Sequence, residues 1–178
     1  MNDLLFLIPA LPLAGFAFLL FFGKRLGEPL AGWVATAAVG GSFAVTVAVF
    51  LDLVSKPDTE RALTQTLFTW LPVGGFQVDM GFLADPLSVA MLLFVTGIAT
   101  LIHLYSIGYM HGDERFSKFF VYLNLFVFSM IMLVLGDNLL VTFLGWEGVG
   151  ACSYLLISFW HESDSNASAI SPATATPS

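Results

Sequence analysis

Long apolar runs without Asp, Glu, Lys or Arg are the feature that most constrains this chain. A helix needs about 18 such residues to cross a lipid bilayer, and four runs reach that length. A fifth run is equally apolar except for one acid, Glu147, near its middle. The runs are too long and too continuously apolar for the alternating strands of a membrane barrel. We therefore predict an all-α integral membrane protein with about five transmembrane helices, over residues 4–22, 30–51, 86–112, 119–136 and 138–160.

The composition agrees with a membrane protein and excludes several kinds of site. Hydrophobic residues make up 57% of the chain and charged residues 11%, a balance unlike that of soluble domains. The single cysteine, Cys152, cannot by itself form an iron–sulfur cluster, a structural zinc site or a disulfide framework. The sequence also lacks the glycine-rich motifs of dinucleotide and nucleoside triphosphate sites. We therefore expect no cofactor and no metal ion on this chain.

One helical region is expected over residues 1–162, and its longest connection, residues 52–85, carries strand signals. Residues 76–82 alternate between apolar and polar, a period typical of a β-strand. A second run, residues 66–71, precedes it across a turn composition, Pro72-Val73-Gly74-Gly75. The pattern predicts a short β-hairpin in this loop, with an irregular loop as the alternative.

Six basic residues lie in the connections and indicate an orientation, because positively charged loops stay in the cytoplasm. Five spans place two of them, Lys56 and Arg61, on the side that holds most of the loop acids. The larger group on the other side predicts an outside N-terminus and a cytoplasmic location for Lys24, Arg25, Arg115 and Lys118.

Glu147 is the candidate site residue with the clearest physical argument. A charged side chain at the centre of a bilayer costs about 2.5–3.5 kcal/mol, so such residues face protein or water. Gly150 and Ala151 lie one turn away on the same helical face and leave room for water or a partner side chain. We also expect Gly145, Gly148 and Gly150 to loosen the helix around the acid. A carboxylate here can relay a proton, and the alternative is a static pair that fixes helix packing.

His103, in the third predicted span, is the second candidate because an imidazole exchanges protons near neutral pH. A structural histidine at a helix contact is the alternative. Both candidates point to a proton pathway rather than to electron transfer, for which this sequence offers no centre.

Four stretches of the sequence stand in an order and spacing that make coincidence improbable. They read FLADPLS at residues 82–88, LYSIGYM at 104–110, RFSKFFVYLNLF at 115–126 and GWEGVGACSYLLI at 145–157. Together they closely resemble the L subunit of bacterial proton-pumping NADH-quinone oxidoreductase, respiratory complex I. The resemblance covers residue 1 to about residue 169.

The resemblance implies an antiporter-like subunit of the membrane arm, in which quinone reduction elsewhere in the complex drives proton passage. It implies that Glu147 is a proton-transfer carboxylate whose charge is modulated by a Lys on a later helix. NADH, FMN, the iron–sulfur clusters and quinone would be handled by other subunits. The implied partners are the other membrane-arm subunits and the lipid bilayer, with no nucleic acid, and the implied location is the bacterial inner membrane.

The later Lys and the family's further helices are absent from this sequence, so we expect a truncated or frameshifted product. The family pattern gives way after Ala169. Residues 163–178 lack aromatic residues and nearly all branched apolar residues, so we expect a disordered, aberrant tail. Coupled transport by the isolated chain is not expected.

Two alternatives come from other classes. One is the large subunit of a multisubunit cation/proton antiporter, which shares the membrane Glu but works without NADH oxidation. The other is a non-catalytic membrane fragment, consistent with the missing Lys and helices. The continuation Gly148-Val149-Gly150-Ala151-Cys152 after the acid favours the respiratory subunit over the antiporter.

Overall fold

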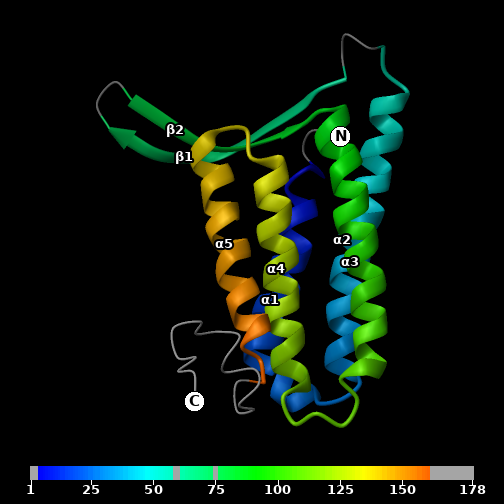
Figure 1. Ribbon diagram of the computed structural model, residues 1–178. Coiled ribbons are helices and arrows are strands. Elements are labelled where there is room, and N and C mark those ends of the chain that lie inside the picture. The colour runs from blue at the N-terminus through cyan, green and yellow to red at the C-terminus, as the bar shows by residue number, and fades with distance from the viewer. Residues whose placement is uncertain (1–3, 58–60, 74–75, 161–178) are drawn as a thin grey trace, which may run out of the picture.

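In the part of the chain that the structure describes, five long helices form one bundle, with a two-stranded hairpin across one end (Figure 1). The structure, a computed structural model, describes residues 4–57, 61–73 and 76–160. Each helix is long and apolar enough to cross a membrane, which confirms the predicted architecture. The helices are α1 (Leu7–Leu26), α2 (Leu30–Val54), α3 (Pro86–Tyr109), α4 (Phe116–Leu135) and α5 (Leu139–Ile157).

Local sequence signals explain where several helices begin. The Asp85 carboxylate accepts a hydrogen bond from the Ser88 backbone N–H at 2.7 Å, and Pro86 occupies the first turn of α3. The Ser88 hydroxyl also donates to this carboxylate, at 2.7 Å. The backbone bond and then the hydroxyl bond from Ser88 hold the pKa of Asp85 below its usual value. Asn138 caps α5 in the same way, since its side-chain oxygen accepts the N–H groups of Leu140 and Val141 at 3.1 Å.

The predicted hairpin is confirmed, and its strands are longer than the sequence indicated. Strand β1 (Leu63–Val73) pairs antiparallel with β2 (Phe76–Ala84). The register is irregular at two places in β1, between Thr66 and Phe68 and between Thr69 and Leu71. Such irregularities bend and twist a two-stranded ribbon. The hairpin leaves the bundle and extends past the start of α5 (Figure 1).

Helix α4 is the centre of the bundle, because it packs against α1, α2, α3 and α5. Its buried residues take part in two apolar clusters. Ile131 and Leu135 belong to the cluster near the hairpin, together with Phe82 of β2. Phe116 and Phe120 belong to a second cluster toward the opposite end. Residues of α4 therefore contribute to the apolar core at both ends of the bundle.

The hairpin is fixed to the turn between α4 and α5 by backbone and side-chain bonds. The Asp137 backbone N–H donates to the Gly81 carbonyl at 3.2 Å, and the Asn138 amide donates to the Asp79 carbonyl at 2.8 Å. Phe82 also pairs with Gly136 as an isolated bridge. Asn138 thus connects the start of α5 to β2 through one side chain.

Basic residues gather at the end of the bundle opposite the hairpin. Lys24 and Arg25 lie in the last turn of α1, while Arg115 and Lys118 lie at the start of α4. This grouping agrees with the one used to predict the orientation. The tail predicted to be disordered, residues 163–178, lies outside the described residues.

Gly81→Ala is expected to weaken the docking of the hairpin. A Cβ atom at Gly81 would lie 2.6 Å from the Asp137 carboxyl carbon, which is too close for an undisturbed contact. Overpacking of this kind costs about 1–3 kcal/mol. Thermal unfolding of the full chain in detergent and hydrogen exchange of the β2 amides measure the loss. The double variant Gly81→Ala/Asp137→Gly removes the clashing side chain, and equal destabilisation of both variants would contradict this account.

Candidate functional site

Glu147 lies on an outer face of α5 at mid-helix. Its side chain is exposed, and so are Gly150, Ala151 and Tyr154, which share its face of the helix. Within the described residues the carboxylate has no hydrogen bond or ion pair. Helix α5 packs mainly against α4, and this face points away from that contact.

An ionised carboxylate cannot face hydrocarbon at this depth without a large free-energy cost, about 2.5–3.5 kcal/mol on insertion scales. Water or further protein therefore has to cover this face of α5 if Glu147 is charged. The small side chains at Gly150 and Ala151 leave space for either. Tyr154, 59% exposed, lies one turn further on and offers a hydroxyl to the same surface.

The glycines beside Glu147 have a role that the sequence did not reveal. A Cβ at Gly145 would lie 2.7 Å from the Leu133 Cα, and one at Gly148 would lie 2.5 Å from the Ser129 hydroxyl oxygen. Both glycines therefore allow close approach of α5 to α4. Gly150 differs, since nothing lies within 4 Å of its Cβ position. Helix α5 is continuous across all three glycines, and two of them, Gly145 and Gly148, serve close packing on α4.

His103 is fully buried in the bundle, on α3. Its Nδ1 lies 2.8 Å from the Ala99 carbonyl oxygen. A carbonyl only accepts, so Nδ1 carries the proton and donates, and Nε2 of the neutral ring is left as an acceptor. Nε2 is buried and has no hydrogen-bond partner in the described part of the chain. The ring contacts Phe120, with 6.0 Å between centroids.

A cavity of about 250 Å³ adjoins His103 between α3 and α4, and its other lining residues are apolar. They include Phe94 and Ile98 of α3 with Phe126 and Met130 of α4. The structure does not bring His103 and Glu147 together, because α4 lies between α3 and α5 (Figure 1). The two predicted candidates are therefore separate features.

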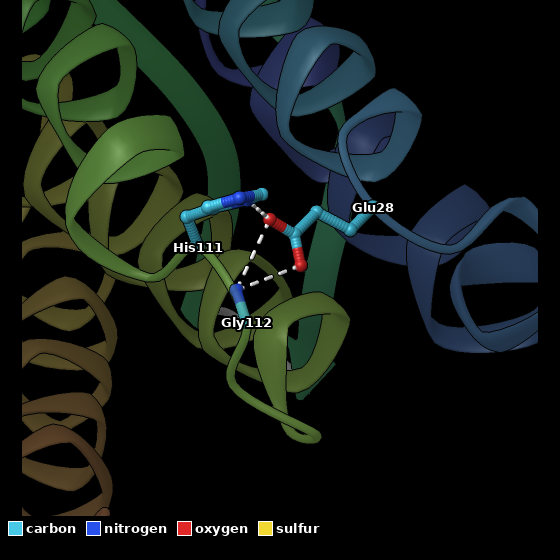
Figure 2. A network of polar contacts seen from close by, with 3 residues as sticks. All are labelled: Glu28, His111 and Gly112. Atoms are coloured by element: carbon cyan, nitrogen blue, oxygen red, sulfur yellow. Dashed lines mark hydrogen bonds and ion pairs between the residues drawn. The ribbon is translucent and has the colours of Figure 1, made fainter.

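Glu28 forms a polar network that the sequence reasoning missed (Figure 2). Its carboxylate accepts hydrogen bonds from the Gly112 backbone N–H at 3.0 and 3.2 Å and contacts Nδ1 of His111. The Gly112 N–H, and secondly His111, hold the pKa of Glu28 below its usual value. The network joins the α1–α2 and α3–α4 connections. Its partners are more than 80 residues apart in the sequence, so no local pattern could reveal it.

In the part of the chain that the structure describes, no three His, Cys, Asp or Glu side chains gather to hold a metal ion. Cys152 is buried and reduced. The prediction that redox cofactors are held by other subunits stays a prediction.

The fold defines a multi-span helical membrane protein with one carboxylate at the middle of its fifth helix. Residues 70–120 match the family described as NADH-ubiquinone oxidoreductase (complex I), chain 5 N-terminus. Over 94% of its length the chain is 46% identical to NADH-quinone oxidoreductase subunit L of Mycobacterium tuberculosis, covering 26% of that protein. It is 44% identical over 94% of its length to subunit L of Escherichia coli, covering 27% of it. The chain is also 44% identical, over 84% of its length, to NADH-ubiquinone oxidoreductase chain 5 of Cryphonectria parasitica, and it covers 22% of that protein.

Over most of its length the chain is therefore similar to subunit L and chain 5 of complex I. The shared region is the antiporter-like N-terminal part. The chain spans about a quarter of the length of the curated relatives it matches, 26% for the Mycobacterium tuberculosis protein.

Gly145→Ala is expected to separate α5 from α4 and to destabilise the chain by about 1–3 kcal/mol, because backbone atoms of Leu133 occupy the Cβ position. Thermal unfolding of the full chain in detergent measures the effect. Gly150→Ala is the matched control on the same helix, since its Cβ enters open space. We expect little loss of stability in Gly150→Ala. An equal loss of stability in the two variants would show that helix flexibility, and not packing on α4, determines the stability of the chain.

Proposed function

We propose that this chain contributes the N-terminal part of a proton-translocating, antiporter-like subunit of the membrane arm of NADH-quinone oxidoreductase. In this proposal, quinone reduction elsewhere in the complex drives proton passage through the subunit. The supporting observation is Glu147, a carboxylate at the middle of an apolar helix that no described residue neutralises. The names of the relatives, NADH-quinone oxidoreductase subunit L, supply the reaction to which the carboxylate is coupled.

Glu147 acts in this proposal as a proton relay. Close packing of Gly145 and Gly148 on α4 fixes the helix, so the carboxylate keeps one direction while its charge changes. Protein or water on the exposed face then determines whether the charged or the neutral form is favoured, since a nearby cation stabilises the anion and an apolar surrounding stabilises the acid. The resemblance implies that this cation is a Lys on a later helix of the family, which this sequence does not contain.

His103 has a separate place in the proposal. Its acceptor nitrogen, Nε2, is the polar atom of an otherwise apolar region next to the α3–α4 cavity. It can take a proton inside the bundle but has no direct path to Glu147 through the packed α4. We therefore assign the relay to Glu147 and keep His103 as a second proton-accepting group.

The proposed location is the inner membrane of a bacterium, with other membrane-arm subunits as partners. The end of the bundle that carries Lys24, Arg25, Arg115 and Lys118 faces the cytoplasm, and the hairpin faces outside. The electron-transfer cofactors belong to other subunits, and the isolated chain is not expected to couple transport to a redox reaction.

Cysteine labelling tests the orientation. Lys118→Cys is expected to be protected from a membrane-impermeant thiol reagent in intact cells and to react after the cells are opened. Ser55→Cys, at the exposed end of α2 on the hairpin side, is expected to react in intact cells. Native Cys152 is buried and gives a low background. Labelling of Lys118→Cys from outside would overturn the orientation.

Glu147→Gln tests the proton relay in an assembled complex whose subunit carries this region. The amide keeps the size and hydrogen-bonding capacity of the acid but cannot take and release a proton near neutral pH. Loss of general acid–base function typically lowers rates by about 100-fold or more. We expect proton uptake driven by quinone reduction in reconstituted vesicles to fall strongly, with the amount of assembled complex unchanged.

Two further variants define the outcome for Glu147. Glu147→Asp keeps a titratable group and is expected to be milder, while Glu114→Gln changes an exposed acid outside the helices and is expected to be neutral. Normal pumping by an assembled Glu147→Gln complex would contradict the relay. Loss of assembly in Glu147→Gln would favour the static packing role instead.

A further inference from the structure

A polar hollow of about 430 Å³ lies between the end of α1 and the start of α4, on the end of the bundle opposite the hairpin. Its basic lining residues are Lys24, Arg115 and Lys118. The two helices meet beside it, where the Ser117 hydroxyl donates to the Gly23 carbonyl at 2.8 Å. The walls of the hollow therefore come from these two helix ends, which a specific contact holds together, and from the α1–α2 and α3–α4 connections.

Two of the three acids that line the hollow already accept hydrogen bonds from within the chain. Glu28 accepts from the Gly112 N–H and contacts His111, as Figure 2 shows. Asp113 accepts from the Arg115 backbone N–H at 2.7 Å and from the Trp160 indole N–H at 3.0 Å. The third acid, Glu114, is exposed. The acidic side of the hollow is thus largely occupied by internal donors.

The lysines of the hollow keep their donors available. Neither Lys24 nor Lys118 has a hydrogen bond or ion pair in the described structure, and both are exposed. The Lys118 ammonium lies over the Tyr122 ring at 5.7 Å, and the Arg115 guanidinium lies over the Phe159 ring at 5.4 Å. These contacts hold both cations near the hollow, and the two lysine ammonium groups keep N–H donors for an anionic ligand.

Aromatic residues mark this end of the bundle as the level of a membrane surface. Tyr105 and Tyr109 stack at 5.8 Å, and Tyr109 contacts Trp160 at 6.3 Å. Both tyrosines are more than half exposed, at 69% and 57%. Tyr and Trp concentrate where hydrocarbon meets the polar headgroups. The hollow therefore lies at headgroup depth.

Exposed apolar side chains continue from the hollow along α1 toward the middle of the bundle. Leu20 and Phe21 are 55% and 75% exposed. They precede Lys24 by four and three residues and therefore share its face of α1. A molecule with an anionic head in the hollow would find an apolar surface for its chains directly beside it.

We propose that this hollow binds the headgroup of an anionic phospholipid, with Lys24 and Lys118 contacting the phosphate and Arg115 adding positive charge. Basic pockets between membrane helices recognise anionic lipid headgroups in this way. A free phosphate would use the cations but not the adjoining apolar surface. The proposal is independent of proton transfer by Glu147.

Native mass spectrometry of the full chain tests the proposal, with mixed micelles of phosphatidylglycerol, phosphatidylethanolamine and phosphatidylcholine as the probes. A basic side chain near an anionic lipid contributes about fivefold to binding. The unmodified chain is expected to prefer phosphatidylglycerol, and Lys24→Gln/Lys118→Gln is expected to reduce that preference about fivefold or more. Lys24→Arg/Lys118→Arg should retain it.

Arg25→Gln is the matched control, because Arg25 lies in the same turn of α1 as Lys24 but does not line the hollow. It is expected to bind phosphatidylglycerol like the unmodified chain. An equal loss of phosphatidylglycerol preference in Arg25→Gln would show that general surface charge, and not the hollow, causes the preference. That result would overturn the proposed site. A preference for phosphatidylethanolamine, or full competition by inorganic phosphate, would overturn the anionic-lipid assignment.

A measurement on the unmodified chain covers the case in which the lysine variants do not fold. Phosphatidylglycerol with a photoreactive group in its headgroup should cross-link to peptides that contain residues 24–28 or 113–118. Cross-links spread evenly over both ends of the bundle, or confined to the hairpin end, would overturn the proposal.

Discussion

Close packing of α5 on α4 is the contact on which the position of Glu147 depends. Gly145 and Gly148 turn toward α4, and a side chain there would meet Leu133 or Ser129. A helix rotates about 100° per residue, so Glu147 points about 160° from Gly145 and about 100° from Gly148 around the helix axis. The glycines that bring the helices together therefore also direct the acid outward, and the packing and the proposed chemistry are two consequences of one stretch of sequence.

Several hydroxyl side chains inside the bundle are satisfied within their own helices, unlike the carboxylate of Glu147. Thr46, Thr96 and Ser129 each donate a hydroxyl hydrogen bond to the carbonyl four residues earlier, at 2.6–2.9 Å. Such bonds let a hydroxyl lie in an apolar surrounding at little cost. Glu147 has no donor of this kind in the described structure, so its carboxylate depends on groups outside these five helices.

The helices and the hairpin could be predicted because they follow from local sequence. Run length gives the spans, and alternation over residues 76–82 gives a strand. Long-range contacts could not be predicted: the Asn138 bond to Asp79 and the Glu28 network join residues far apart in the chain. The residues that share a helical face with Glu147 followed from helical geometry, but the packing role of its neighbouring glycines required the partner helix. Separation of His103 from Glu147 likewise depends on the order of helices in space.

The central claim is that Glu147 changes its protonation during turnover. Infrared difference spectroscopy of an assembled complex, with and without quinone reduction, measures this directly through the carbonyl stretch of a protonated carboxyl group. The account predicts a carboxyl band that appears or disappears on turnover and is missing in Glu147→Gln. An identical difference spectrum in Glu147→Gln, from complex assembled to the same amount, would contradict it.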